Sequence, residues 1–221
     1  MNSQVILYIA RIFAIFVSLP VHEFAHGYSA NLLGDKTAKR EGRLSLNPLR
    51  HLDPVGTAAI LFCGFGWAKP VPVNANNFSK PKRGMALVAL AGPVSNLILA
   101  LIGICFLKIN LILLPMLTSG AYLPSHEFIT IFTYFSIINI NLAVFNLIPI
   151  PPLDGSRLVT YFIPQPYYNL LMRYEIFGTV LVMALLFLGV LDWPMKIAGE
   201  GFLSFLDFIT QPIDMLGGLV H

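Results

Sequence analysis

Residues 19–33 read LPVHEFAHGYSANLL, which places the pattern HEFAH at positions 22–26 inside an apolar stretch typical of a membrane-spanning helix. On a helix, His22 and His26 lie one turn apart on one face, so both imidazoles can reach a single metal ion. Two imidazoles and a carboxylate are unfavourable in hydrocarbon unless they serve a site or face the protein interior. A chance match of this short pattern is therefore the less favoured interpretation, and the segment predicts a metal site within the membrane.

The residue between the histidines indicates what such a site would do. Zinc lowers the pKa of a bound water toward about 7, and a carboxylate beside that water can take its proton and pass it to the leaving amine. Glu23 is placed to face the open position of a metal held by His22 and His26. The pattern thus favours peptide hydrolysis with one zinc ion per chain and Glu23 as general base.

The composition is that of an integral membrane protein. Of the 221 residues, 56% are apolar and 11% are charged, whereas roughly a quarter are charged in an ordinary soluble domain. The net charge is +3, and nine of the fourteen Lys and Arg residues lie between Lys36 and Arg83. Because no aromatic residues interleave with them in the manner of a nucleic-acid module, they indicate a cytoplasmic face and exclude a nucleic-acid partner.

Cysteine usage and the N-terminus add two expectations. Cys63 and Cys105 both lie in apolar runs, without a Cys or His partner at ligand spacing. We therefore expect neither a disulfide framework nor a cysteine-ligated zinc. The N-terminus lacks the basic region and cleavage site of a signal peptide, so we expect its first apolar segment to remain in the mature chain.

Four apolar segments reach the length of about 20 residues that a spanning helix needs. They are Gln4 to Leu33, Met85 to Leu107, Phe128 to Ile150 and Tyr174 to Leu191. The stretch Val55 to Trp67 is too short to cross and is flanked by basic residues, so we expect a re-entrant or interfacial element. The stretch Ile197 to Val220 carries several polar residues and is either a further span or, as we favour, an interfacial helix.

These segments predict an α-helical polytopic membrane protein with four to six transmembrane helices and a short re-entrant β element, formed as a single domain over residues 1–221. The positive-inside rule places the N-terminus outside the cell membrane and His22 and His26 in the cytoplasmic half of the first span. The span Phe128 to Ile150 then ends on the same side. We therefore expect an active site that faces the cytoplasm.

A catalytic zinc of this type needs a third protein ligand beside an open position for water. The candidates are Asp35, His51, Asp53, His126, Glu127 and Asp154. Asp154 is favoured because its span ends on the same side as the histidines, prolines interrupt the helix before it, and Gly155 permits close backbone approach. We expect His51 and Asp53 to belong to a solvated loop, and His126 to lie at the outer face.

Five motifs resemble those of the intramembrane site-2 protease family, specifically its short bacterial members without a PDZ or CBS domain. They are HEFAH at 22–26, GRLSLNP at 42–48, GWAKPVPV at 66–73, AGPVSN at 91–96 and NLIPIPPLDG at 146–155. The resemblance covers nearly the whole chain. It implies a zinc ion bound by His22, His26 and Asp154, with Glu23 as general base.

The resemblance also implies how substrate is held. Asn146 takes the position of an asparagine that contacts substrate near the scissile bond, and its amide can donate to the developing oxyanion. Without the resemblance, a contact between helices, as we interpret Asn139 and Asn141, is an equally favoured role. The stretch from Gly64 to Val73 resembles the family's re-entrant β element, in which Gly64 and Gly66 would let a strand edge lie beside an unwound substrate.

The remaining motif, at residues 91–96, is interpreted mainly as structural. Gly92 and Pro93 are expected to let helices approach and bend, and Asn96 either lines the site or bonds across helices. Only about twenty residues separate Leu107 from Phe128, which is too few for an accessory domain of 50 residues or more, roughly the lower limit of domain size. We therefore expect no internal domain that selects substrates.

Together these patterns predict a zinc endopeptidase that cleaves within or near the transmembrane segments of protein substrates in the lipid bilayer. The main alternative is a transporter or metal-conducting protein that uses the His, Glu and Asp cluster as a cation relay. Such transporters usually have two related halves, and this chain shows no internal repeat. An inactive scaffold is disfavoured because every ligand and base position is filled.

Overall fold

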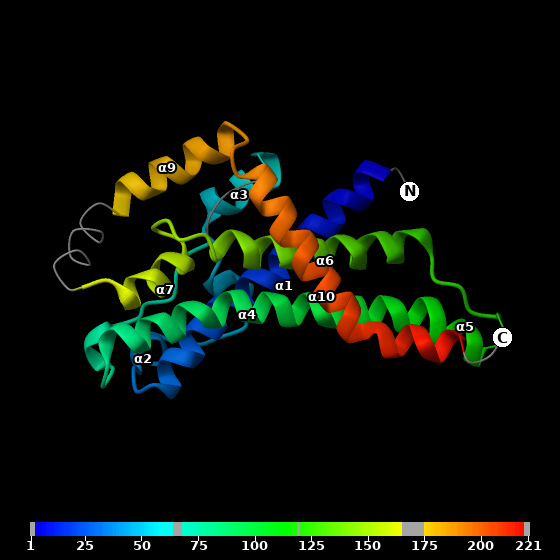
Figure 1. Ribbon diagram of the computed structural model, residues 1–221, viewed down its shortest axis with the longest axis horizontal. Coiled ribbons are helices and arrows are strands. Elements are labelled where there is room, and N and C mark those ends of the chain that lie inside the picture. Colours follow the sequence, from blue (N-terminus) through cyan, green and yellow to red (C-terminus); the bar gives the residue numbers. More distant parts are fainter. Residues whose placement is uncertain (1–2, 64–67, 119, 165–174, 219–221) are drawn as a thin grey trace.

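A computed structural model describes residues 3–63, 68–118, 120–164 and 175–218 of the protein, which form a bundle of helices (Figure 1). The long helices are α1 (Ser3–Leu32), α4 (Pro81–Lys108), α6 (His126–Asn146) and α10 (Asp192–Gly218). The shorter ones are α2 (Thr37–Arg40), η1 (Pro48–Arg50), α3 (Pro54–Cys63), η2 (Ala75–Asn77), the π-helix η3 (Ile109–Leu113), α5 (Leu114–Leu117), α7 (Asp154–Phe162) and α9 (Glu175–Phe187).

Helices α1, α4 and α6 pack against one another and form the core of the bundle. Alanines at their contacts, such as Ala14, Ala100 and Ala143, are fully buried. Small side chains let helix backbones approach closely. In a lipid bilayer, where the hydrophobic effect does not drive helices together, this close packing is a main source of helix association. At Gly103 of α4 a side chain would clash with the Ser136 hydroxyl of α6. The sequence therefore sets the close spacing of these three helices.

The same three helices are long and apolar enough to cross a membrane. The candidate spans are Gln4–Leu32, Pro81–Leu117 and His126–Asn146. Their outward faces expose large apolar side chains, including Phe16 and Ile102. A contiguous apolar surface of this kind is rare on soluble proteins and is normal for a face that contacts lipid. The protein is a helical, multi-pass membrane protein.

The C-terminal part differs from the straight span predicted at Tyr174 to Leu191. Helix α9 has only 13 residues, and the chain then bends by 86° into α10. Gly189, with a positive φ of 68°, lies at this bend, where a side chain would be strained. The described chain thus has three candidate spans, or four if α9 and α10 form one broken span. We favoured an interfacial helix for the stretch Ile197 to Val220. Helix α10, which contains most of this stretch, packs against α6 and α4.

The predicted re-entrant β element is not found in the described residues. The apolar stretch after Asp53 begins as helix α3, and the only pairing described nearby is a single antiparallel bridge between Leu52 and Ala68. Gly64 and Gly66 lie outside the described residues. Beyond them the chain continues without helix or strand to η2, and part of this stretch contacts α1, as described below.

Candidate metal centre

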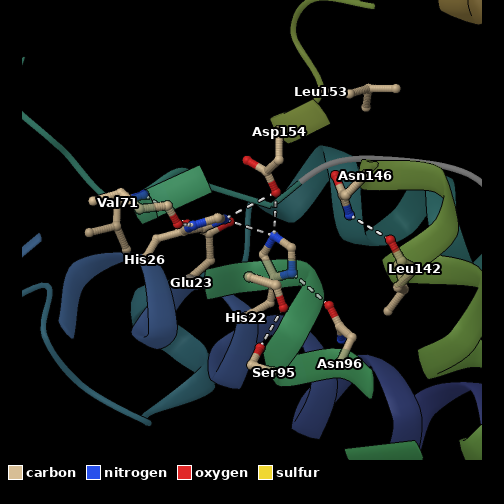
Figure 2. Close-up of polar contacts among 12 residues, drawn as sticks. His22, Glu23, His26, Val71, Ser95, Asn96, Leu142, Asn146, Leu153 and Asp154 are labelled. Atoms are coloured by element: carbon tan, nitrogen blue, oxygen red, sulfur yellow. Dashed lines mark hydrogen bonds and ion pairs between the residues drawn. The ribbon is translucent and has the colours of Figure 1, made fainter. Parts of the chain in front are cut away.

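Three side chains from two distant segments of the sequence converge on one position (Figure 2). His22 and His26 lie one turn apart on α1, and their Nε2 atoms are 3.0 Å apart. Oδ2 of Asp154, the first residue of α7, lies 3.3 Å from each of these nitrogens. In the part of the chain that the structure describes, no other group of three such side chains is close enough to share a metal ion.

The geometry and chemistry of this group fit a zinc ion. Ligand atoms bonded at about 2.0 Å to a tetrahedral zinc lie roughly 3.3 Å from one another, which matches the separations here. Oδ2 of Asp154 is buried and has no hydrogen-bond donor. A buried carboxylate oxygen without a donor is unfavourable unless a cation satisfies it. Two imidazoles and one carboxylate are also a ligand set that zinc hydrolases use.

The position of Asp154 depends on a tight connection between α6 and α7. Helix α6 ends at Asn146, and seven residues that include three prolines separate it from Asp154. Gly155 lies so close to the Leu147 carbonyl that any side chain there would clash with the backbone. The expectation that Gly155 permits close approach is therefore confirmed. This contact brings the start of α7 back toward α1.

Helix α4 lies directly against the two histidines. Nδ1 of His26 is 2.8 Å from the carbonyl oxygen of Val88, and Nδ1 of His22 is 2.6 Å from Oδ1 of Asn96. Between these partners, a Cβ at Gly92 would lie 2.5 Å from atoms of both imidazole rings. Val88, Gly92 and Asn96 are four residues apart and share one face of the helix. The motif at 91–96 therefore contacts the two candidate metal ligands on α1 as well as packing helices together.

Glu23 is held by the segment that follows the undescribed stretch. Its Oε2 accepts a hydrogen bond from the backbone N–H of Val71 at 2.9 Å, and the side chain is buried. This contact places a stretch of backbone without helix or strand beside His22, His26 and Asp154, which we call the metal group. It also fixes one carboxylate oxygen of Glu23 and leaves Oε1 for other contacts.

Asp35, a rejected candidate for the third ligand, anchors the same segment a few residues further on. The carboxylate is buried and accepts hydrogen bonds from the Asn74 backbone N–H and the Asn77 side chain, both at 2.7 Å. It also accepts from the backbone N–H and the hydroxyl of Thr37. Burial alone would raise the pKa of Asp35, but these donors together lower it below its ordinary value. Asp35 is therefore an ionised anchor outside the metal group.

Asn146 lies in the last turn of α6, close to Asp154 in the view of Figure 2. Its Nδ2 donates to the carbonyl of Leu142 at 2.9 Å. An amide nitrogen carries two N–H groups, so this bond leaves one of them. Asn146 thus lies at the end of α6 that leads to Asp154, and half of its donor capacity is engaged within its own helix.

The other candidates lie elsewhere. The expectation of a solvated His51 is wrong, because its side chain is fully buried and its Nε2 lies 2.6 Å from the Ser45 carbonyl. Asp53 accepts from the Gly56 backbone N–H at the start of α3. His126 begins α6 and Asn146 ends it, so this helix of 21 residues holds the two about 30 Å apart. None of these residues belongs to the metal group.

Sequence reasoning assigned no role to the Val88 carbonyl or to Asp35, and it left Asn96 between two roles. The contacts that these groups make depend on how α1, α4 and the loops pack together. The spacing of residues along one helix does not reveal that packing. One available signal was that Asn96 and Asn139 are amides in otherwise apolar helices, where a polar side chain must find a partner.

Comparison with known proteins identifies the family. A curated protein of Bacillus subtilis (strain 168), "Putative zinc metalloprotease YwhC", is 42% identical over 210 residues, which cover 91% of this chain and 93% of the relative. A profile of Peptidase family M50 matches residues 111–189. The chain belongs to peptidase family M50. It is a zinc metalloprotease of the site-2 type, and the resemblance seen in its motifs is confirmed.

Further curated relatives are described as "Putative zinc metalloprotease Rip2". The protein from Mycolicibacterium smegmatis is 32% identical over 69% of this chain and 57% of the relative. The protein from Mycobacterium tuberculosis (strain H37Rv) is 27% identical over 83% of this chain and 71% of the relative. No solved structure matches the chain. Membership of M50 removes the transporter and the inactive scaffold as alternatives.

Proposed function

We propose that this M50 protease hydrolyses peptide bonds within or next to the transmembrane segments of other membrane proteins. One zinc ion per chain would be held by His22, His26 and Asp154, with Glu23 as general base. The observation that carries the proposal is that three possible metal ligands, His22, His26 and Asp154, converge beside α1, a helix apolar enough to span the bilayer. One ligand atom, Oδ2 of Asp154, is buried and accepts no hydrogen bond.

The proposed chemistry divides between the metal and the side chains around it. Bound zinc would supply a water of lowered pKa and polarise the scissile carbonyl. Glu23 would take a proton from that water through Oε1 and deliver it to the leaving nitrogen, while the Val71 N–H keeps its other oxygen in place. The remaining N–H of Asn146 would donate to the oxygen on which negative charge develops.

The segment from Pro70 to Asn74 is suited to hold an unwound substrate. The N–H of Val71 is bonded to Glu23 and that of Asn74 to Asp35, and the prolines at 70 and 72 have none. In this described stretch the only remaining backbone donor is Val73. Its N–H and the carbonyls near it can replace hydrogen bonds that a substrate helix loses on unwinding. Gly64 and Gly66, which precede this segment, stay predicted substrate contacts.

We also infer that the site opens toward the cytoplasm and that the protein resides in the cell membrane. Basic residues concentrate where α1 ends and α4 begins, which is the end of the bundle that carries the metal group. A cysteine introduced at the exposed Glu41 tests the orientation. We expect an impermeant thiol reagent to label it only after cells are opened, and labelling of intact cells would contradict the proposed orientation.

The function is tested by comparing cells that carry Glu23→Gln as their only copy with cells that carry the parent protein. We expect at least one membrane protein to accumulate uncleaved, with the missing products ending inside or beside a transmembrane segment when mapped by mass spectrometry. Purified Glu23→Gln should retain zinc, because all three ligands remain. Because general-base catalysis contributes about 100- to 10,000-fold, residual cleavage should be at most about 1%. Unchanged membrane proteins, or products that end only in soluble domains, would overturn the proposal.

A further inference from the structure

A chain of buried polar groups leads from His22 on α1 through α4 to the backbone of α6. Asn96 of α4 and Asn139 of α6 are both fully buried. His22 Nδ1 lies 2.6 Å from Oδ1 of Asn96, and Nδ2 of Asn96 donates to Oδ1 of Asn139 at 3.0 Å. Nδ2 of Asn139 then donates to the carbonyl of Phe135 at 2.8 Å. The chain therefore joins three helices and ends on a backbone carbonyl.

The direction of every hydrogen bond in this chain follows from its last member. The Phe135 carbonyl can only accept, so Asn139 must turn its NH₂ group toward it and its oxygen toward Asn96. Asn96 must then turn its NH₂ group toward that oxygen and its own oxygen toward His22. An amide oxygen also only accepts, so the proton of His22 is required on Nδ1.

We propose that this chain, from the Phe135 carbonyl through Asn139 and Asn96, fixes the tautomer of His22 so that its Nε2 lone pair faces the metal position. Asn96 and Asn139 are positioning residues in this proposal, and Asn139 acts only through Asn96. The inference rests on the proposed zinc ligation by His22. It gives a specific role to two asparagines that would otherwise be interpreted as contacts between helices.

His26 provides an internal comparison. Its Nδ1 lies 2.8 Å from the Val88 carbonyl, which can only accept and so requires the proton on Nδ1 without any intermediary. At His22 the partner is a side-chain amide, which could donate or accept depending on how it is rotated. Asn139 removes that ambiguity. Both histidines then direct an Nε2 lone pair toward the proposed metal position, which they share with Oδ2 of Asp154.

The test measures zinc affinity by competition with a chelator, using full-length protein in detergent. Outer partners of metal-bound histidines contribute about 10- to 100-fold in affinity, so we expect Asn96→Leu to weaken zinc binding by that factor. Asn96→Asp keeps an acceptor for His22 and should bind zinc within a few-fold of the parent. Asn139→Leu should fall between the two, because Asn96 then becomes free to rotate.

Histidine ¹⁵N chemical shifts in the zinc-free full chain report the tautomer directly, with His22→Gln identifying the His22 signals. We expect the parent and Asn139→Asp to carry the proton on Nδ1, and Asn139→Leu to show a mixture of the two tautomers. Asn141→Leu is the matched control, because Asn141 lies on the same helix, is exposed and is outside the chain. It should change neither measurement.

A purely structural role predicts a different pattern. Asn96→Leu and Asn139→Leu would lower thermal stability, yet the variants that fold would keep the parent's zinc affinity and His22 tautomer, and this result overturns the proposal. Equal loss of zinc in Asn96→Asp and Asn96→Leu would also overturn it, because the acceptor would then be irrelevant. Full zinc affinity in His22→Gln would instead contradict the proposed ligand set, so the two failures are distinguishable.

Discussion

The two ends of the α1–α4–α6 bundle both bury polar groups, but among the described residues the end with His22, His26 and Asp154 leaves a buried carboxylate oxygen without a hydrogen-bond donor. At the end near α10, Lys108 pairs with Asp214 at 2.7 Å and Asp207 at 3.4 Å, and the Tyr122 hydroxyl donates to Asn110. Lys108, Asp207 and Asp214 therefore each lie beside an opposite charge. At the other end two imidazole nitrogens and a carboxylate oxygen point at one position, and the oxygen has no donor.

This difference shows which polar clusters in a membrane protein point to chemistry. Both ends are unusual in composition, since charged residues are rare in spanning helices. A set of donors and acceptors that satisfy one another needs no further partner and holds helices together. A set of acceptors that converge needs a cation. The feature that points to chemistry is therefore the buried acceptor without a partner, Oδ2 of Asp154, and not the presence of charge.

The largest effect is expected from removing a ligand at the incomplete end. His26→Ala and Asp154→Ala each leave two of the three protein ligands, so we expect purified protein to lose most of its zinc. Metal content measured by mass spectrometry after dialysis checks this. Asp53→Ala is the control, because Asp53 only contacts the start of α3, and it should keep zinc at the parent level. Full zinc in the Asp154 variant would move the third ligand elsewhere.

A methyl group at Gly92 should disturb the same end without removing any ligand. In Gly92→Ala the new Cβ would lie 2.5 Å from atoms of His22 and His26, so α4 or the imidazoles must shift. Overpacking of this kind typically destabilises by about 1–3 kcal/mol, and we expect zinc affinity to fall at least tenfold, roughly the loss seen when partners of a ligand are displaced.

The control for this substitution is Gly201→Ala on α10. A Cβ there would meet no atom within 4 Å, so zinc affinity should not change. Both variants are compared by chelator competition and thermal unfolding in detergent. Equal zinc affinity in the Gly92 variant and the parent would mean that α4 does not constrain the histidines.

Asp35→Asn should affect substrate handling more than metal binding. The substitution removes the charge that holds the backbone at Asn74, and with it part of the support for the Val71 contact to Glu23. We expect cleavage to fall while zinc stays bound, and we expect Thr37→Val, which removes one of several donors to Asp35, to have a smaller effect. Loss of zinc in the Asp35 variant would show that the anchor supports the metal group itself.

The pH dependence of unfolding gives a second test of this anchor. The folded state lowers the pKa of Asp35, so its carboxylate stabilises the fold above the ordinary aspartate range and loses that contribution as pH falls through the lowered pKa. The parent should therefore lose more stability than Asp35→Asn on acidification. Parallel stability curves for the two proteins would contradict this assignment.

The metal group was predictable because its determinants are local. The four-residue spacing places His22 and His26 on one face of a helix, whatever surrounds them, and the proline-rich turn limits where Asp154 can lie. The partners of the histidines were not predictable, because Val88 and Asn96 face them only through the rotation of α4 about its axis.

The bend between α9 and α10 was missed for a related reason. A hydropathy profile reports how long and how apolar a segment is. It does not report the direction in which the chain turns at Gly189.

The smallest effect is expected at the satisfied end of the bundle. Lys108→Met removes an ion pair whose acidic partners, Asp207 and Asp214, are 53% and 42% exposed, so it should cost at most about 1 kcal/mol of stability. Lys196→Met is the control, since its pair with Glu200 is exposed and 4.0 Å long, and it should change nothing. Thermal unfolding in detergent measures the difference.

Zinc content decides what the Lys108 substitution means for the comparison between the ends. Lys108 contacts α10 through Asp207 and Asp214, and α10 also packs on α6, which leads to Asn146 and Asp154. If the ends are independent, the variant keeps its zinc and its cleavage rate even where it unfolds more easily. If zinc is lost at temperatures where the protein stays folded, α10 transmits a change along α6 to the metal group. The ion pairs at the satisfied end would then support the site as well as hold helices together.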